Sequence, residues 1–167
     1  LKNSANLYEL TDMLKVYPDA CIVWPHRDPS KSVASTVSLI CSMLWGCTDT
    51  PFKVASLDQY MDPQGAAKRL TNVIDLMESG KLPKARVCNV LYRDLVADPV
   101  GTVAKIHEYF HLPFSAESRA TLEEYMRQNP RDKRPPHKVS PETRAAVDRD
   151  RPAFKRYQDY FGVPNED

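Results

Sequence analysis

Two short apolar runs of strand length, separated by stretches with helical periodicity, constrain the fold of this chain most. The first run covers residues 21–24 and follows the turn-like segment 17–20, and the second covers residues 87–91. Continuous apolar runs of this length are typical of strands in parallel sheets, which are buried on both faces. Strands joined through helices run parallel. The sequence therefore predicts an α/β fold, a three-layer αβα sandwich around a parallel sheet.

The segment after the first run changes to helical spacing. Asp28 is suited to cap a helix whose first residue is Pro29. Apolar residues at positions 33, 37, 40 and 44 then recur at helical intervals as far as Gly46. We therefore predict a strand, a tight turn and a helix in this part of the chain.

Further helices are marked by apolar spacing and by capping residues. One covers about 57–80 and is expected to break near Pro63 and Gly65. Another follows Asp98-Pro99 and stops near residue 112, and Ser115 is expected to cap the next. Residues 129–141 are rich in proline and basic side chains, which predicts a loop, and a last helix is expected over about 152–161.

The composition is that of one soluble domain or a large piece of one. The 167 residues are 42% hydrophobic and 27% charged, and no run of about 18 apolar residues could span a bilayer. The chain starts at Leu1 and shows no secretory signal. We expect a cytoplasmic protein whose sequence begins within a domain.

The cysteines lie far apart and form no CxxC pair, which argues against a zinc site and against a disulfide framework. We expect reduced, packed thiols and no bound metal. The four residues are Cys21, Cys41, Cys47 and Cys88.

The net charge is only +1, but residues 127–156 hold ten Lys or Arg against four Asp or Glu. Such a segment is suited to meet phosphates, and it is equally suited to form a solvated helical surface. Nucleic acid is not an expected partner, because acidic residues interrupt the segment and aromatic residues are not interleaved with its arginines.

The turn at residues 26–29 is the first candidate site, because open α/β sheets bind ligands where a parallel strand ends and a helix begins. Arg27 offers a forked guanidinium to a phosphate, Ser35 offers a hydroxyl, and the helix amino terminus adds free N–H groups. The alternative is that Arg27 pairs with a nearby carboxylate and that the serines only cap the helix. His26 is expected to be a hydrogen-bonded structural residue.

The stretch from Tyr17 to Pro29, with Ser35 eight residues after Arg27, resembles the 3′-phosphate-binding segment of the sulfotransferase family, especially its bacterial branch. In that family the arginine and the serine hold the 3′-phosphate of 3′-phosphoadenosine 5′-phosphosulfate (PAPS). The resemblance implies this role for Arg27 and Ser35, and a fold of the P-loop type. It also implies transfer of a sulfuryl group from PAPS to a hydroxyl or amine of a small-molecule or glycan acceptor, without a metal.

A second block, Leu-Tyr-Arg-Asp-Leu-Val-Ala-Asp-Pro at residues 91–99, is similar to the family's Tyr-x-Asp-Leu-x-x-Asp-Pro segment. The family's tyrosine packs near the adenine, which implies such a role for Tyr92. From the residues alone, a core position for this tyrosine is the simpler interpretation. Asp94 and Asp98 are expected to be turn and cap residues. Residues 100–114 resemble the helix and Leu-Pro ending that follow in the family.

The first residues, Leu-Lys-Asn-Ser, are similar to the family's Leu-Lys-Ser-Pro segment, which implies that Lys2 lies near the transferred sulfuryl group. The family's catalytic histidine has no counterpart. Asn3 and Asn6 stand where it is expected, and asparagine cannot act as a base. A late basic loop closes over the 3′-phosphate in the family, which makes Arg134 and Lys138 candidate lid residues.

The family's first phosphate loop has no match in this chain, because the five glycines are scattered and no GxxxxGK[ST] pattern exists. We therefore expect residues 1–167 to be the carboxy-terminal part of a sulfotransferase domain. One alternative is a P-loop small-molecule kinase, which would need a lysine loop and a Mg²⁺-binding aspartate. The other is a non-catalytic remnant that binds a nucleotide or a protein. The sequence does not indicate an oligomeric state.

Overall fold

The computed structural model describes residues 7, 9–51, 62–130 and 141–166. Its centre is a pair of parallel strands, β1 (Ile22–His26) and β2 (Val87–Leu91), in which Ile22 lies opposite Val87 and His26 lies opposite Leu91. In the described part of the chain β1 has β2 as its only strand neighbour. An edge position of this kind tolerates Pro25, which cannot donate a ladder hydrogen bond.

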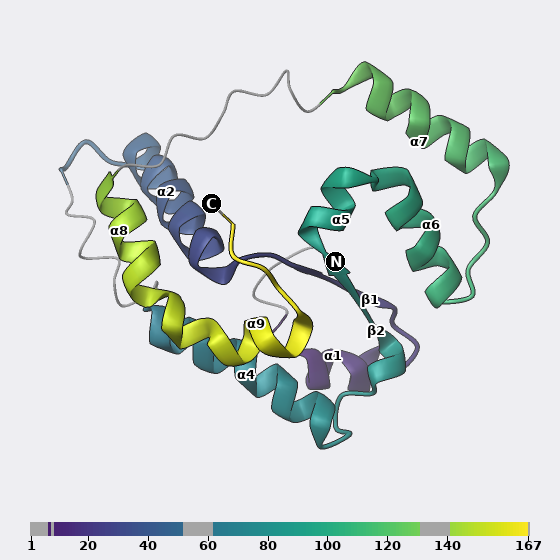
Figure 1. The fold of residues 1–167 in the computed structure, drawn as a ribbon, viewed down its shortest axis with the longest axis horizontal. Coiled ribbons are helices and arrows are strands. Elements are labelled where there is room, and N and C mark those ends of the chain that lie inside the picture. The colour runs from purple at the N-terminus through teal and green to yellow at the C-terminus, as the bar shows by residue number, and fades with distance from the viewer. Residues whose placement is uncertain (1–6, 8, 52–61, 131–140, 167) are drawn as a thin grey trace.

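One face of the strand pair is covered by three helices that contribute the main core (Figure 1). These helices are α1 (Leu10–Val16), α4 (Pro63–Glu78) and α9 (Lys155–Phe161). Alternation along the strands directs Ile22, Trp24 and Val87 toward this face. The buried core residues here are Leu10, Trp24, Val73, Ile74, Met77, Leu82, Val87, Tyr157 and Val163.

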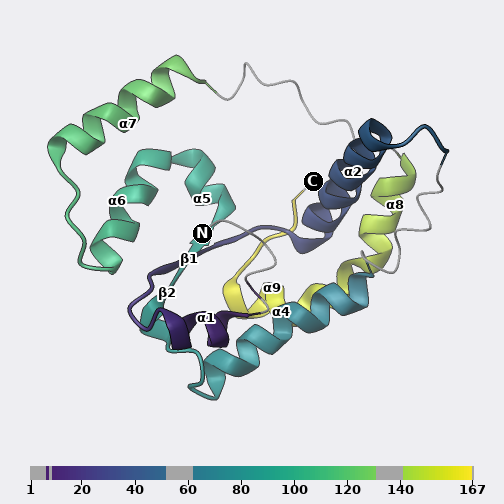
Figure 2. The ribbon, with the colours of Figure 1, turned by 180° about the vertical axis from the view of Figure 1, so that it is seen from behind.

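The other face carries α5 (Tyr92–Ala97) and α6 (Pro99–Tyr109), which follow β2 directly (Figure 2). The hydroxyl of Tyr109 donates to the carbonyl oxygens of Lys84 and Val87, at 2.9 and 3.1 Å, and so ties the end of α6 to the start of β2. Helices therefore lie on both sides of a parallel sheet, which confirms the predicted αβα class.

The remaining helices extend from this centre. The long helix α2 (Pro29–Cys47) continues from β1 and lies against α8 (Pro141–Asp150) and the 3₁₀ turn η5 (Arg151–Phe154). A second 3₁₀ turn, η3 (Lys84–Arg86), precedes β2. Helix α7 (Ala116–Gln128) packs on α6 and lies away from the strands (Figure 1). None of the described helices has both the length and the apolar character that crossing a membrane requires.

The predicted helix starts are confirmed where a side chain caps the helix. Asp28 accepts from the N–H of Ser30, Asp98 from that of Gly101, and Ser115 from that of Ser118. Local capping signals therefore placed α2, α6 and α7 correctly.

Helix α4 begins at Pro63, and Gly65 lies in its first turn. The helical piece expected before Pro63 falls on residues 57–61, which lie outside the described residues, so the break there stays a prediction. Other expectations were wrong. The last helix of the chain is split into η5 and α9, and α1, α5 and α8 were not predicted. The four thiols are free, but Cys21 and Cys47 are exposed rather than packed, and Cys88 is the buried one.

Candidate functional site

A cavity of about 230 Å³ opens at the carboxyl ends of the two strands. Ligands of open α/β sheets bind at this edge. Three segments meet there: the residues after β1, those around the start of α5, and the segment after α9. The cavity is lined by His26, Arg27, Leu91, Tyr92, Arg93, Val96, Val163, Pro164 and Glu166.

Arg27 and Tyr92, two of the residues predicted for the site, meet in this cavity. The register places His26 opposite Leu91, so the residue that follows each strand lies beside the other. The guanidinium carbon of Arg27 lies 4.7 Å from the centroid of the Tyr92 ring, which is cation–π distance. The ring thus supports one face of the guanidinium.

Arg27 also has a carboxylate partner. Its Nε donates to Oε2 and Oε1 of Glu166, at 2.8 and 3.1 Å. The pair is only partly buried, with side-chain exposures of 38% for Arg27 and 28% for Glu166. The carboxylate partner expected in the alternative interpretation is therefore present, and Arg27 also lines an open cavity.

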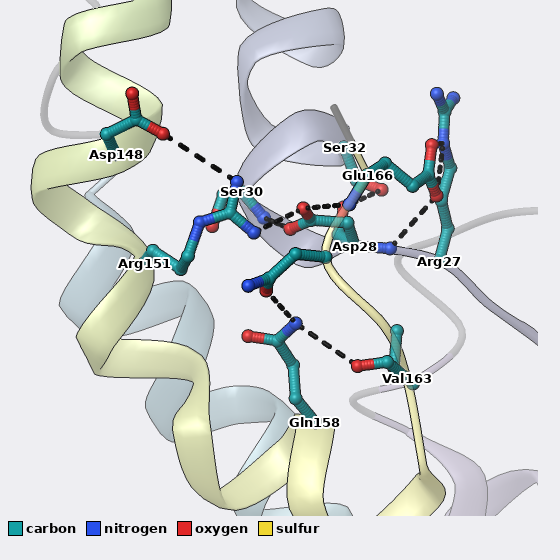
Figure 3. Close-up of polar contacts among 10 residues, drawn as sticks. Arg27, Asp28, Ser30, Ser32, Asp148, Arg151, Gln158, Val163 and Glu166 are labelled. Carbon is teal, nitrogen blue, oxygen red and sulfur yellow. Dashed lines mark hydrogen bonds and ion pairs between the residues drawn. The ribbon is translucent and has the colours of Figure 1, made fainter.

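The end of the Arg27 fork lies beyond the carboxylate that binds Nε. Figure 3 shows its two terminal nitrogens pointing away from Glu166. Neither of them makes a hydrogen bond to any residue within the described ranges. These nitrogens are the groups that bind phosphate oxygens in pairs.

The buried carboxylate of Asp28 joins the start of α2 to the carboxyl-terminal segment (Figure 3). Its Oδ1 caps the helix through the N–H of Ser30 at 3.0 Å. Its Oδ2 accepts from Nη1 of Arg151 at 2.7 Å and from the N–H of Glu166 at 3.0 Å. Sequence reasoning missed Arg151 and Glu166, because no local pattern marks contacts between residues 123 and 138 positions apart.

His26 is a hydrogen-bonded structural residue, as predicted. Its side chain is buried, with Nδ1 2.7 Å from the hydroxyl of Tyr157 and Nε2 2.8 Å from Oδ1 of Asn89. An amide oxygen only accepts, so Nε2 carries the proton and Nδ1 accepts from Tyr157. Burial lowers the pKa of His26 to about 4, against the opposing effect of the Asn89 hydrogen bond. The ring is therefore neutral at pH 7, with both nitrogens occupied.

A model of the sulfotransferase family matches residues 1–116. The chain belongs to the sulfotransferase family. Among solved structures, it is similar to the crystal structure of sulfotransferase STF9 from Mycobacterium avium, with a TM-score of 0.69 and 23% identity. That likeness covers 99% of this chain and 42% of the other, so the chain spans less than half the length of the solved sulfotransferase. No curated protein matches the chain.

The other residues for which the sulfotransferase resemblance implies a role either lie away from this cavity or fall outside the described residues. Ser35 is an exposed residue of α2, is not part of the cavity lining, and makes no hydrogen bond to a described residue. Lys2, Asn3, Asn6, Arg134 and Lys138 lie outside the described residues. The structure thus brings Arg27 and Tyr92 together, but it does not bring Ser35 into the same cavity.

The described part of the basic segment 127–156 is largely paired with carboxylates. Arg151 binds Asp28, and Arg156 binds Asp75 at 2.5 Å and Glu78 at 3.3 Å. These ion pairs raise the pKa of Arg156 and link the start of α9 to α4. A solvated, paired helical surface therefore describes these two arginines better than a phosphate-binding tract does.

Proposed function

We propose that this chain holds the nucleotide end of the sulfate donor in a sulfotransferase that uses PAPS. The acceptor would be a hydroxyl or amine of a small molecule or glycan. One observation carries the proposal: Arg27, whose terminal nitrogens have no hydrogen-bond partner among the described residues, lies over the ring of Tyr92 at the carboxyl edge of the sheet. Both residues belong to the part of the chain that matches the sulfotransferase family.

The residues at the cavity fit the nucleotide end of this donor. The planar fork of Arg27 suits the 3′-phosphate, which it would bind through two parallel N–H···O bonds. The ring of Tyr92 offers an apolar surface to the adenosine. Ser35 lies outside the cavity lining, so its contact with the 3′-phosphate stays a prediction from the resemblance. The same holds for Lys2 near the sulfuryl group and for Arg134 and Lys138 over the 3′-phosphate.

In the proposed reaction the acceptor oxygen or nitrogen forms a bond to sulfur while the bond from sulfur to the donor's phosphate oxygen breaks. The acceptor's proton passes to a base. Arg27 and Tyr92 would act away from the sulfur, by fixing the donor through its remote end so that the transferred group is correctly oriented. His26 is unsuited to be the base, because both its nitrogens are engaged and its pKa is about 4.

The proposal is tested by substituting Arg27 and measuring the binding of adenosine 3′,5′-bisphosphate by calorimetry. We expect Arg27→Ala to weaken binding by about tenfold to a hundredfold, which is the usual loss for a charge-assisted hydrogen bond. Arg27→Lys should recover only part of the affinity, since an ammonium cannot bind two phosphate oxygens as a fork does.

Arg127→Ala on α7 is the matched control, because Arg127 is an exposed arginine that pairs with Glu124 on its own helix. Adenosine 5′-monophosphate, which has no 3′-phosphate, should bind the Arg27→Ala variant and the unsubstituted protein with similar affinity. An unchanged affinity of Arg27→Ala for the bisphosphate would contradict the proposal.

A non-catalytic nucleotide-binding role is the second candidate, because asparagines stand where the family's histidine is expected. The two roles differ in one measurement. A sulfotransferase transfers labelled sulfuryl groups from PAPS to an acceptor, including in the presence of a chelator. A remnant binds the nucleotide without turnover. The expected cytoplasmic location remains a prediction from the sequence.

A further inference from the structure

The Glu166 carboxylate already occupies donors that an incoming anion would use. Both its oxygens accept from Nε of Arg27, at 2.8 and 3.1 Å. Oε1 also lies 3.3 Å from the N–H of Asp28, the residue that caps α2. A carboxylate from the end of the chain is therefore bound to the same guanidinium that the proposed function assigns to the phosphate, through Nε and beside the terminal nitrogens (Figure 3).

We propose that Glu166 is a built-in competitor for this anion site and that a bound 3′-phosphate displaces its side chain. This inference rests on the proposed function for the identity of the ligand. It assigns Glu166 the role of a residue that sets affinity and selectivity. The net binding free energy of a ligand is then the difference between its own interaction with Arg27 and that of the Glu166 carboxylate it displaces.

Displacement requires a rotation of one side chain and no unfolding of the segment that carries it. The backbone of this segment has its own attachments. The N–H of Glu166 donates to Oδ2 of Asp28 at 3.0 Å. Gln158 accepts from the N–H of Val163 through its carbonyl, and its side-chain amide donates to the Val163 carbonyl and to Asn165. These bonds hold the chain in place when the carboxylate swings out.

The energetics also favour exchange. Arg27 and Glu166 are 38% and 28% exposed, and partly solvated ion pairs of this kind contribute little net free energy. The other charges near the cavity are paired among themselves, Arg93 with Asp94 and Arg151 with Asp28. Release of Glu166 therefore leaves Arg27 as a locally uncompensated cation. A phosphate dianion gains more from it than a carboxylate does, so the competitor should select phosphates over carboxylates.

A different arrangement would reverse the sign of the effect. If the phosphate bound the terminal nitrogens while Glu166 kept its hold on Nε, the glutamate would orient the arginine and assist binding. In that case its removal would weaken the ligand. The sign of the change in affinity on substitution of Glu166 therefore decides between the two roles.

The test compares Glu166→Gln with the unsubstituted protein by calorimetry with adenosine 3′,5′-bisphosphate. Glutamine keeps the size and the backbone bonds but removes the negative charge. We expect binding about twofold to fivefold tighter, which is the range that a partly exposed ion pair provides. The gain should shrink in 0.5 M salt, because screening weakens the competition as well, and it should be much smaller for adenosine 5′-monophosphate.

Glu124→Gln on α7 is the matched control, since Glu124 is exposed and pairs with Arg127 within its own helix. It should leave the affinity unchanged. Equal or weaker binding of the bisphosphate by Glu166→Gln would overturn the inference, and weaker binding would make Glu166 an orienting residue.

Failure of the proposed function gives a different pattern. The unsubstituted protein would then bind the bisphosphate no better than the monophosphate, and Arg27→Ala would change nothing. Inorganic phosphate serves as the second probe in that case. Tighter phosphate binding by Glu166→Gln, lost again in the double variant with Arg27→Ala, supports the competitor role without the donor assignment. Unchanged phosphate binding overturns it.

Discussion

The imidazole of His26 links three parts of the molecule through two hydrogen bonds and a stack. Its nitrogens join Asn89 on β2 to Tyr157 on α9, and its ring lies 4.1 Å, centroid to centroid, from that of Phe161. The next residue in the chain is Arg27. A buried, neutral histidine therefore fixes the point from which the candidate anion-binding side chain leaves the strand.

The pKa of His26 predicts how stability depends on pH. The unfolded chain takes up a proton near pH 6.5, whereas the folded chain does so only near pH 4. Between these values the unfolded state binds more protons, so the free energy of unfolding falls as the pH is lowered. We expect a loss on the order of 2–3 kcal/mol across this window from His26, measured by urea unfolding at closely spaced pH values.

His26→Phe isolates this contribution, because phenylalanine keeps the stack on Phe161 but cannot titrate. The variant should be less stable at pH 7, since Tyr157 and Asn89 lose their partner. Between pH 6.5 and 4, however, the free energy of unfolding of the variant should fall much less than that of the unsubstituted protein. If the free energy of unfolding of the variant fell with pH as steeply as that of the unsubstituted protein, a group other than His26 would cause the loss of stability between pH 6.5 and 4.

At the same scale, the sequence could indicate Arg27 and Tyr92 but not their partners. Both residues directly follow short apolar strands, and the parallel register alone brings them together. Glu166 and Arg151 carry no comparable signal, because an ion pair between distant residues depends on how the last helices pack. Ser35 shows the converse, since a motif spacing does not establish that a side chain reaches the cavity.

At the scale of elements, the residue that caps α2 also binds the carboxyl-terminal part of the chain. Asp28 is fully buried and also binds Arg151 and the backbone of Glu166. We expect Asp28→Ala to lower the free energy of unfolding by about 2–4 kcal/mol, because it removes the cap and leaves a partly buried arginine without its main partner. Urea unfolding provides the measurement.

Asp98→Ala is the matched control for this prediction. Asp98 caps α6 through the N–H of Gly101 at 2.8 Å, an exposed contact with no ion pair. Its removal should cost only about 1 kcal/mol. Equal losses at the two aspartates would mean that the bonds from Asp28 to the carboxyl-terminal segment add no stability.

Substitution of two helical glycines by alanine should change the stability in opposite directions. Gly46 lies inside α2, and a Cβ there would meet nothing within 4 Å, so Gly46→Ala should stabilise by up to about 1 kcal/mol. A Cβ on Gly101 would overlap the capping carboxylate of Asp98. Gly101→Ala should therefore destabilise despite the better helix propensity of alanine. Thermal unfolding of both variants tests the pair, and stabilisation by both would contradict the capping geometry.

The elements that sequence reasoning found are those with local signals. Capping residues set the starts of α2, α6 and α7, and apolar runs set β1 and β2. The helices that were not predicted have weaker signals in the sequence. Helix α8 begins at Pro141 within a basic, proline-rich stretch, and α1 is only seven residues long. Helix α5 starts directly at the end of β2, without the loop that usually separates a strand from a helix.

At the scale of the whole molecule, the last residues close the structure against its first strand. Helix α9 ends at Phe161, and the cap residue Gly162, with a φ of 65°, turns the chain back toward the sheet. Val163 belongs to the same buried core as Trp24, and the N–H of Glu166 donates to Asp28 at the start of α2. The chain thus ends near α2 (Figure 1). The candidate site is therefore built from three segments that lie far apart in the sequence, and its geometry depends on the packing of the last two helical elements.

This dependence can be tested at Phe154, a residue of η5 that is 1% exposed. The turn η5 lies against α2, α4, α8 and α9, so this side chain sits where the helices on either side of the site converge. We expect Phe154→Ala to cost about 3–5 kcal/mol, and Phe154→Leu less than about 2 kcal/mol, since leucine fills most of the same space.

Because η5 joins elements from the whole chain, the loss at Phe154 should appear as a single cooperative transition. Circular dichroism and tryptophan fluorescence should then report the same midpoint in urea. Phe114→Ala, a half-buried ring beside His107 on α6, should cost clearly less. If the two probes separated in Phe154→Ala, with the helical signal surviving the fluorescence change, α8 and α9 would be an independent unit. The Arg27 site would then owe its geometry to a docking equilibrium.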